Sequence, residues 1–479
     1  MSSVDILVAP YNYITDNSAS KIELENKILV IDEAHNFEQL LESTGSFSIT
    51  SNDLAQSYDE VSFAEHDVFC KELADRSRSL RWILKVIDTI KAELENHANQ
   101  SESDASYQLK IDEIIEVFVK AEAFFIQSEV WNAVSAELNK YYSKPSTLSR
   151  MTGDNFGYFV HLISELEMVR KDDLCECYGV TISVGRIDDE TAKMKLKLFN
   201  LEPKIGMNKI EKNNLYNIIC TSGTLSPVED YARLLNLDHN GEREVVLLSN
   251  SHVIDKEQLF VATVANRENI EFLNVYANRE NRQMHTAYRQ SLADLANCAP
   301  AGTLFFHSTY SQMESCETNW KYFLSEFHKK MYFESRSQKS TAMTVESFRK
   351  EIAKENGTAI LNCVISGKCS EGVNFTDDLG RLSVICGIPY PPKNDPRIIQ
   401  KRAYLDNLVR TKKGSISGAQ WYTINASRAV SQAIGRIIRH KYDFGSIIFM
   451  DRRFGSDVPH NFRSYLPTWL GDVQSMESV

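Results

Sequence analysis

Short apolar runs separated by amphipathic stretches recur along the chain and dominate its second half. The runs are rich in Val, Ile, Leu and Phe and end at polar residues or glycine, which predicts buried strands. We place strands at Ile28–Ile31, Val180–Val184, Met194–Phe199, Tyr216–Cys220, Gln258–Thr263, Gly302–Phe306, Thr358–Val364, Ser383–Gly387 and Ser446–Met450. Amphipathic helices, such as Asn281–Leu295 and Ser311–His328, are expected between them. This alternation predicts an α/β fold with a parallel sheet covered on both faces.

Residues from about Thr50 to Lys171 follow a helical pattern instead. Apolar residues recur every three or four positions in two stripes. The first stripe holds Leu73, Leu80, Ile83, Leu84, Ile87 and Leu94, and the second holds Ile111, Ile114, Ile115, Phe118 and Phe125. The polar stretch Asn96–Tyr107 is expected to be a loop between them. The segment is long enough to form a helical subdomain inserted between strands.

Composition sets the broad class of protein. The 479 residues are 43% hydrophobic and 25% charged, which is ordinary for a globular protein. No apolar stretch approaches the ~18–20 residues that span a bilayer, and the first residues lack the features of a signal peptide. We therefore expect neither secretion nor a membrane partner. The nine cysteines are odd in number and scattered through apolar runs, which favours a reducing compartment.

Charge is distributed unevenly along the chain. The formal net charge is −12, but residues 1–300 carry −19 and residues 301–479 carry +7. Residues 401–450 alone hold nine basic and two acidic side chains. Local charge sets the field that a polyanion meets, so the last third of the chain is a candidate for binding nucleic acid. A solvated surface with no ligand is the alternative.

Two carboxylates follow the first predicted strand, in the string Ile31-Asp32-Glu33-Ala34-His35. The carboxyl end of a parallel strand is where α/β proteins place their ligands. Asp32 is then positioned to hold Mg²⁺ on a nucleotide, and Glu33 to polarise an attacking water as general base. Two solvent-exposed acids after a strand are the alternative.

A basic helix is predicted over Ala429–His440. Gln432, Arg436 and Arg439 would share one face of this helix, while the interleaved isoleucines bury the other face. An arginine pair suits a phosphoryl transition state, whose charge is spread over several oxygens. A basic surface helix is the alternative.

Two loops of small residues complete the set of motifs. Gly367–Thr376 follows a strand, and its glycines would let backbone N–H groups approach phosphate oxygens closely. Thr221–Pro227 places hydroxyl groups after another strand, where they can bond a carboxylate, a phosphate or their own backbone. A simple turn and a capping turn are the respective alternatives.

The four motifs occur in the order DEAH, TSGT, GKxSEG and QxxGRxxR. This order resembles the XPD-like branch of superfamily 2 DNA helicases, which carry an iron–sulfur cluster. Within that branch the chain resembles most the telomere-length-regulator and Fanconi anaemia group J helicases. Ala9–Tyr13, Gly387–Pro392 and Ile438–Gly445 also match. The resemblance runs from about Val4 to Leu470 and is weakest in the helical insertion.

The resemblance implies two RecA-like P-loop NTPase domains, the first of them incomplete, with a helical arch inserted in the first. Residues 1–50 would be the remnant of helicase domain 1 with the DEAH motif, and 51–171 the arch-like insertion. Residues 172–240 would return to domain 1 with the TSGT motif, and 241–479 would form RecA-like domain 2. The implied activity is ATP- and Mg²⁺-dependent 5′–3′ unwinding of single-stranded or forked DNA, in DNA repair within the nucleus.

The motif match also assigns roles to residues. The catalytic residues would be Glu33, Arg436 and Arg439, with the two arginines as arginine fingers. The nucleotide and its Mg²⁺ would be contacted by Asp32, His35, Gly367, Glu371, Gly372 and Gln432, with Asp32 as the metal ligand. DNA contact, or coupling of hydrolysis to movement, would fall to Ser222, Gly223, Thr224 and Ser308.

Two features of the family do not occur in this sequence. The phosphate-binding pattern GxxxxGK[ST] is absent, and Gly-Lys occurs once, at Gly367-Lys368. The four cluster-ligating cysteines expected before the DEAH motif are absent too, because no residue before Asp32 is a cysteine. Cys175 and Cys177 form the closest pair in the sequence, and two such ligands do not make a four-cysteine site. Without a P-loop, tight binding of the β- and γ-phosphates is lost. A sheet without its P-loop strand would leave apolar faces uncovered.

Three hypotheses follow. We expect the N-terminally truncated chain of an active ATP-dependent DNA helicase, because the remaining motifs are intact. The alternative is a non-hydrolysing helicase paralogue that binds DNA or a protein partner through its arch and its basic second domain. An unrelated α/β protein is the third reading, which four motifs in family order disfavour.

Overall fold

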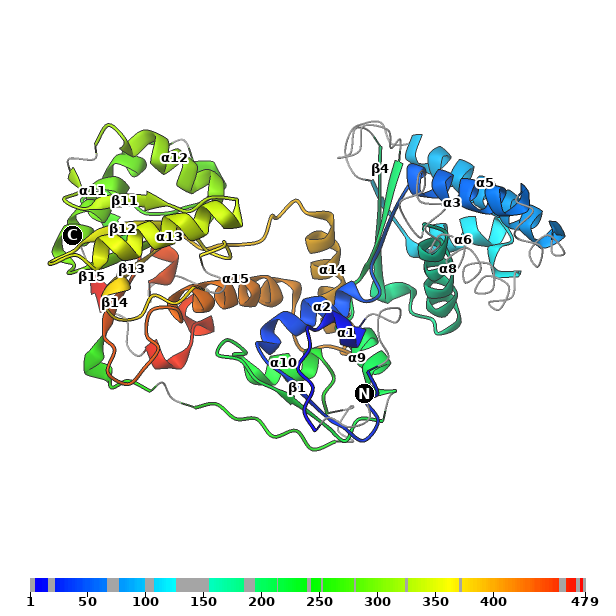
Figure 1. Cartoon of the computed structure of the whole chain (residues 1–479), viewed down its shortest axis with the longest axis horizontal. Helices are drawn as coiled ribbons and strands as arrows, with labels where there is room; N and C mark the ends of the chain where they lie inside the picture. Colours follow the sequence, from blue (N-terminus) through cyan, green and yellow to red (C-terminus); the bar gives the residue numbers. More distant parts are fainter. Residues whose placement is uncertain are drawn as a thin grey trace. The chain divides into compact units, whose positions relative to one another are not determined.

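The computed structural model describes residues 5–15, 22–66, 77–99, 107–125, 155–184, 194–212, 214–238, 243–250, 253–279, 281–323, 326–369, 373–455, 462–470 and 474–476. The chain divides into two compact units (Figure 1). Unit 1 comprises Met1–Leu29, Asn36–Ile218 and Asn394–Arg410. Unit 2 comprises Val30–His35, Ile219–Lys393 and Thr411–Val479. No helix in the described ranges is both long and apolar enough to cross a bilayer.

Unit 2 is built on a parallel sheet whose described strands have the order β11-β12-β10-β13-β14-β7-β15. The strands are β7 (Leu259–Val264), β10 (Gly302–His307), β11 (Lys330–Phe333), β12 (Ala359–Val364), β13 (Leu382–Cys386), β14 (Gly445–Phe449) and β15 (Gln474–Met476). Every residue of β10, β12 and β13 is buried, because helices cover both faces. The predicted parallel α/β sheet is confirmed.

Helices pack on both faces of this sheet. α11 (Arg282–Cys298) and α12 (Tyr310–Trp320) share a core with one face, and α13 (Gln338–Ile352) and α15 (Gly418–Ile434) share a core with the other. The predicted helix beginning at Ser311 ends at Trp320 and not at His328. The sequence reading did not identify β11 or α13. The four residues of β11, Lys330–Phe333, show too weak an alternation of apolar and polar side chains to predict a strand.

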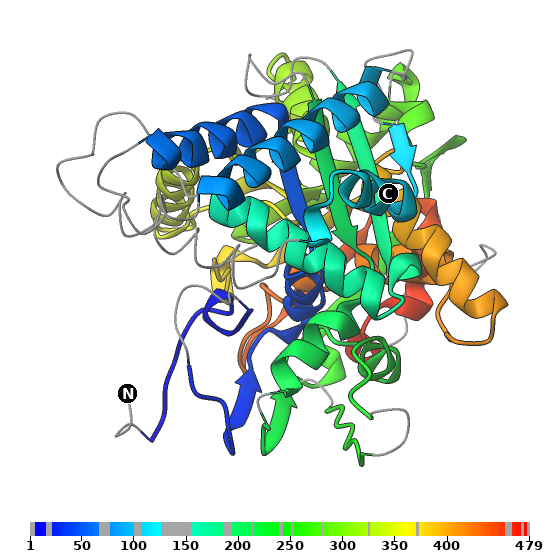
Figure 2. The ribbon, with the colours of Figure 1, turned by 90° about the vertical axis from the view of Figure 1, so that its right-hand side faces the viewer.

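The insertion in unit 1 combines helices with an antiparallel sheet (Figures 1 and 2). Its helices are α3 (Ser51–His66), α5 (Ser77–Asn99), α6 (Ile111–Lys120) and α8 (Asn155–Lys171). Its strands, in the order β2-β5-β4-β3, are β2 (Phe47–Thr50), β3 (Tyr107–Leu109), β4 (Tyr178–Val184) and β5 (Met194–Asn200). One apolar core joins both layers, and it buries the predicted stripe residues Leu80, Ile83, Leu84, Ile87, Leu94, Ile111, Ile114, Ile115 and Phe118.

Several expectations for this region need correction. Phe125 is 70% exposed and lies outside the core. α5 extends through Asn99, so the beginning of the expected loop is helical. β4 and β5, which the sequence reading placed in the return segment 172–240, pair with β2 and β3 in the insertion's own sheet. Alternating apolar positions identify a strand but not the sheet that it joins. Leu73 lies outside the described residues.

The first strand, β1 (Ile28–Ile31), differs from the fully buried strand that was expected. It pairs with β6 (Asn217–Cys220), and within the described residues these two form a two-stranded sheet. Leu29 and Ile31 are buried, but Ile28 and Val30 are 56% and 58% exposed. One face of β1 is therefore apolar and exposed.

α14 (Pro396–Arg410) is anchored inside unit 1 by a buried ion pair. The Nζ atom of Lys401 lies 2.7 Å from Oε1 of Glu42, and the Nη2 atom of Arg397 lies 2.6 Å from Oε2 of the same carboxylate. Burial raises the pKa of Glu42, and the ammonium of Lys401 opposes that shift. Gln400 also donates to the backbone oxygen of Val180. The attraction between the Glu42 carboxylate and its two cationic partners thus offsets part of the free energy lost when these groups leave water.

Breaking this pair is expected to destabilise unit 1. Lys401→Met removes the buried partner of the Glu42 carboxylate and leaves it with the more exposed Arg397, which costs up to about 3–5 kcal/mol. Denaturant unfolding followed by hydrogen exchange in α14 measures the loss. Lys171→Met is the matched control, because Lys171 pairs with Glu167 on an exposed helix surface and its loss costs at most about 0.5 kcal/mol. Equal stability of the two variants would show that the pair does not anchor α14.

Candidate functional site

The DEAH turn and the TSGT loop are held together by backbone hydrogen bonds inside unit 2. The N–H of Thr221 donates to the oxygen of Ile31 at 2.9 Å, and the N–H of Ala34 donates to the oxygen of Thr221 at 3.0 Å. Between these bonds the chain turns sharply, and Glu33 has a φ of 47°. The turn therefore directs the exposed side chains of Asp32 and Glu33 away from the strand.

Three side chains meet in front of this turn. The Nδ1 atom of His35 lies 2.7 Å from Oγ of Ser222 and 3.3 Å from Oε2 of Glu33. The hydroxyl of Ser222 donates to Oε2 of Glu33 at 3.2 Å, and the N–H of Thr224 donates to Ser222 at 3.2 Å. Ser222 can donate only one proton, so His35 completes the set by donating from Nδ1 to the serine oxygen.

Charge and burial keep the His35 ring neutral. Burial lowers the pKa of His35; Glu33 acts to raise it, while Arg428 and Arg436 act to lower it. Burial and the positive charge of Arg436 also lower the pKa of Arg439, against the attraction of Glu33. The arginines after α15 and the carboxylate of Glu33 therefore lie close enough to influence each other electrostatically.

The predicted single helix through Gln432, Arg436 and Arg439 is wrong. α15 ends at Ile434 with Gly435 as its C-cap, so only Gln432 is helical; Arg436 follows in a turn and Arg439 in irregular chain. Gly435 itself keeps right-handed backbone angles, with φ −67° and ψ −2°. The N–H of Phe375 donates to the oxygen of Arg436 at 3.0 Å and fixes that turn. The isoleucines 434, 437 and 438 are buried as expected.

The sequence reading missed two residues of this site. The hydroxyl of Tyr231 donates to the oxygen of Ala34 at 2.6 Å. The guanidinium of Arg428 lies 5.7 Å from the centre of the Tyr231 ring, within reach of a cation–π contact. Arg428 precedes Gln432 by one helical turn, and that spacing was the available signal. Tyr231 in α10 (Val228–Leu234) offers no comparable pattern.

The glycine loop after β12 rests on a buried carboxylate that was also missed. Glu334 accepts hydrogen bonds from the N–H groups of Val364 and Lys368 and from the hydroxyl of Tyr310. A Cβ atom at Gly367 would lie 2.5 Å from Oε1 of Glu334, so only glycine fits there. Glu371 and Gly372, two predicted nucleotide contacts, lie outside the described residues.

The remaining predicted residues are placed on loops of unit 2. Ser308 follows β10, and both its N–H and its hydroxyl donate to Oε1 of Gln312 in α12. Gly223 has open space around its Cα, which leaves its backbone accessible. Ser308 and Gly367 follow neighbouring parallel strands, so both lie at the carboxyl edge of the sheet.

The metals that the resemblance implies fit this chain unequally. Asp32 is exposed, and its Oδ1 accepts a hydrogen bond from the N–H of Glu33 at 3.0 Å, so its carboxylate suits Mg²⁺. The described residues bring no four cysteines together. Their candidate metal-binding groups are Glu334, Cys363 and Cys369, and Asp377, His440 and Asp443. A 4Fe–4S cluster does not fit either group.

Comparison with known proteins identifies relatives. Residues 292–473 match the family described as "Helicase C-terminal domain", and residues 1–54 match "DEAD_2". The "Regulator of telomere elongation helicase 1 homolog" of Aedes aegypti is 30% identical over 98% of this chain and 50% of its own length. The "Regulator of telomere elongation helicase 1" of Rattus norvegicus is 28% identical over 97% of this chain and 40% of its own length. Among solved structures, "XPD_APO" shares the fold with a TM-score of 0.51 at 18% identity, over 98% of this chain and 81% of that one.

By sequence the chain is similar to helicases, through the C-terminal domain model and through relatives named regulators of telomere elongation, as the sequence resemblance indicated. The likeness to the XPD structure shows a shared fold. The chain spans about half the length of the curated relatives that it matches. The roles of individual residues are not tested by these similarities and stay predictions.

The electrostatic arrangement predicts how His35 titrates. Glu33→Gln removes the charge that raises the pKa of His35, so this pKa falls further; Arg436→Ala removes an opposing charge and raises it. NMR titration of the His35 ring in the full chain measures both shifts. Glu25→Gln, an exposed change in the turn before β1, leaves the titration unchanged. An upward shift in Glu33→Gln would contradict the arrangement.

Proposed function

We propose that this chain serves ATP-dependent 5′–3′ DNA unwinding, with unit 2 carrying the groups that hydrolyse ATP and couple hydrolysis to movement. The observation that carries the proposal is the convergence of Glu33, His35 and Ser222 in the field of Arg436 and Arg439. A carboxylate facing cationic guanidinium groups is the arrangement that phosphoryl transfer to water needs.

Each residue in this proposal has one chemical task. Glu33 takes the proton of the attacking water, and the hydrogen bond from Ser222 orients its carboxylate. Arg436 and Arg439 stabilise the charge that develops on the transferred phosphoryl group. Asp32 would hold Mg²⁺, which neutralises phosphate charge when bound. Gln432, Gly367, Glu371 and Gly372 are proposed nucleotide contacts.

The hydrogen bonds around Ser222 suggest how hydrolysis couples to DNA. His35 and Glu33 contact the same hydroxyl that orients the N–H of Thr224. A change in charge at Glu33 therefore alters the TSGT loop, in which Ser222, Gly223 and Thr224 are proposed to contact DNA or transmit the change. Ser308 is the proposed contact in the second RecA-like domain. Single-stranded or forked DNA as the ligand, a role in DNA repair and nuclear location are proposed on the basis of the family.

A second function rests on the charge of the last third of the chain. Residues 301–479 carry +7, so they can bind a polyanion whether or not ATP is hydrolysed. A non-hydrolysing paralogue would keep DNA or partner binding through the insertion and the basic last third, without turnover. Salt-sensitive DNA binding in the absence of any DNA-stimulated ATP hydrolysis distinguishes this function from the first.

Glu33→Gln in the full-length protein tests the hydrolytic proposal. DNA-stimulated ATP turnover is expected to fall roughly 10²–10⁴-fold, the usual worth of a general base. Fluorescence anisotropy with labelled DNA should show unchanged affinity, since the variant removes only the proton acceptor. Glu25→Gln is the matched carboxylate control and should retain full turnover. If the full-length wild-type protein binds DNA but shows no stimulated turnover, the non-hydrolysing function replaces the first.

Arg439→Ala tests the arginine-finger role. The guanidinium is expected to contribute about 10³–10⁵-fold to turnover, with little effect on DNA affinity. Steady-state ATP hydrolysis and DNA anisotropy, measured on the same preparation, separate the two effects. Intact turnover combined with weakened DNA binding would make Arg439 a DNA contact instead.

A further inference from the structure

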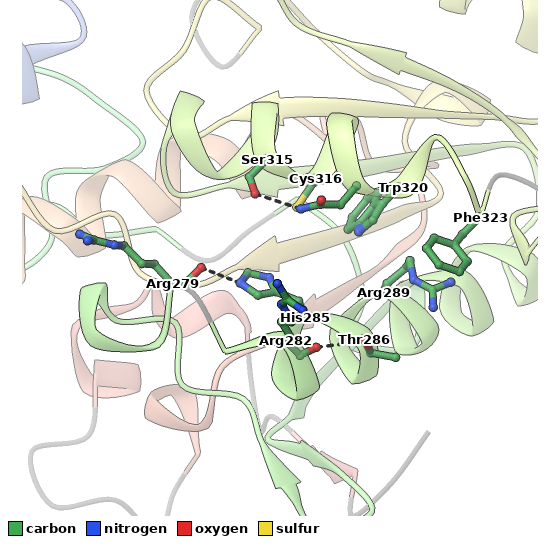
Figure 3. A pocket seen from close by; sticks show the side chains of 10 residues that line it. Arg279, Arg282, His285, Thr286, Arg289, Ser315, Cys316, Trp320 and Phe323 are labelled. Carbon is green, nitrogen blue, oxygen red and sulfur yellow. Dashed lines mark hydrogen bonds between the residues drawn. The ribbon is translucent and has the colours of Figure 1, made fainter.

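A cationic groove crosses the outer surface of α11 and α12, apart from the residues discussed so far. Its main cavity has a volume of about 580 Å³ and is lined by Arg279, Arg282, His285, Thr286, Arg289, Ser315, Cys316, Asn319, Trp320 and Phe323 (Figure 3). All of these residues belong to unit 2. None of them is acidic, so the cavity presents positive charge and hydrogen-bond donors without a lining carboxylate.

The arginines of this groove differ in what they already bind. Arg289 is buried, forms an ion pair with Glu326 and lies with its guanidinium 3.9 Å from the centre of the Phe323 ring. Arg282 is exposed, and no carboxylate in the described part of the chain pairs with it. Arg289 is therefore part of the cavity wall, while the guanidinium of Arg282 is accessible to a ligand. The His285 ring is held by the backbone oxygen of Arg279, 2.8 Å from its Nε2.

Exposed aromatic rings flank the cations. Tyr276 is 81% exposed, and the guanidinium of Arg279 lies 3.7 Å from the centre of its ring. Phe323 is 43% exposed on the other side of the cavity. Each ring has an arginine guanidinium near one face, and its exposed area is accessible to a ligand. Flat rings beside guanidinium groups can stack with planar bases.

The groove continues beyond the main cavity. A second cavity of about 510 Å³ shares Arg282 and Thr286 with the first and extends to Arg267, Glu268, Ile270, Gln283, Ala287 and Gln290. Arg267 pairs with Asp294 at 2.6 Å, so this end is closer to neutral. Two cavities joined at Arg282 suit an extended ligand better than a compact one.

We propose that this groove binds the backbone of single-stranded nucleic acid, with a phosphate at Arg279 and Arg282 and an unpaired base stacked on Tyr276. The inference rests on the proposed DNA function and adds a contact site outside the helicase motifs. Repeating phosphates fit a groove with two cavities, and hydroxyl and amide groups at Thr286, Ser315 and Asn319 can bond sugar or phosphate oxygens. A phosphopeptide would use the arginines but leave Tyr276 without a planar partner.

The test compares two double variants of the full chain by anisotropy with labelled oligo(dT) over a range of salt concentrations. Arg279→Ala/Arg282→Ala is expected to weaken binding at least about tenfold and to reduce the slope of log K against log salt by about 0.7, from one lost single-strand phosphate contact. Lys339→Ala/Lys350→Ala removes the same charge from exposed positions of α13, on the other face of the sheet, and should leave affinity and slope nearly unchanged.

Tyr276→Ala supplies a second readout, because it removes a ring and no charge. Affinity is expected to fall roughly 5- to 150-fold with an unchanged salt slope, as for the loss of one stacked base. Ultraviolet crosslinking of oligo(dT) followed by peptide mapping should mark Tyr276 in the wild-type chain. Circular dichroism melting of every variant checks that folding is intact.

Each outcome decides the inference. Weaker binding by the arginine and tyrosine variants, with the lysine variant unaffected, supports the groove. Equal oligo(dT) binding by wild type and arginine variant overturns the groove but leaves the proposed function standing. A wild-type chain that binds no oligo(dT) overturns both. Arginine-dependent binding of a labelled phosphopeptide, with no loss of oligo(dT) affinity, assigns the groove to a protein partner and also overturns the inference.

Discussion

The candidate site depends on the paired backbone bonds between Ile31, Ala34 and Thr221. Without them, the DEAH turn and the TSGT loop, which lie far apart in the sequence, would not be held side by side. With them, Glu33 and Ser222 are held within hydrogen-bonding distance, and His35 is placed against both. The left-handed backbone at Glu33 and the hydroxyl of Tyr231, which donates to Ala34, keep this frame in one conformation. Arg436 and Arg439 therefore act electrostatically on side chains, Glu33 and His35, whose positions these hydrogen bonds already hold.

The sequence predicted the strands of unit 2 well, because continuous apolar runs report burial on both faces. It predicted β1 only in part, since the pattern of a run does not reveal whether both faces find partners. It also misplaced Arg436 and Arg439, because Gly435 lies inside an otherwise helical pattern and a C-cap depends on the packing that follows. Glu334 and Tyr231 act through backbone contacts with distant residues, and such contacts leave no local pattern in a sequence.

Charged groups are arranged differently in the two units. In unit 1, Lys401 and Glu42 form a buried ion pair that holds α14 in place. In unit 2, Glu33 is exposed and contacts the hydroxyl of Ser222, which also contacts His35, a ring whose pKa burial lowers. A buried ion pair resists rearrangement, whereas a carboxylate with a shared donor can exchange partners at low cost. The distribution of charge thus separates the parts built for rigidity from those suited to chemistry.

The division of the chain between its units has a consequence for connectivity. Val30–His35 belongs to unit 2, but the residues on both sides of it belong to unit 1. Asn394–Arg410 shows the reverse arrangement, a unit 1 segment bounded by unit 2. Each unit therefore holds a short piece of chain that is joined to the other unit at both ends. The backbone passes from one unit to the other on both sides of the DEAH segment, so Glu33 is covalently linked to unit 1 in both chain directions.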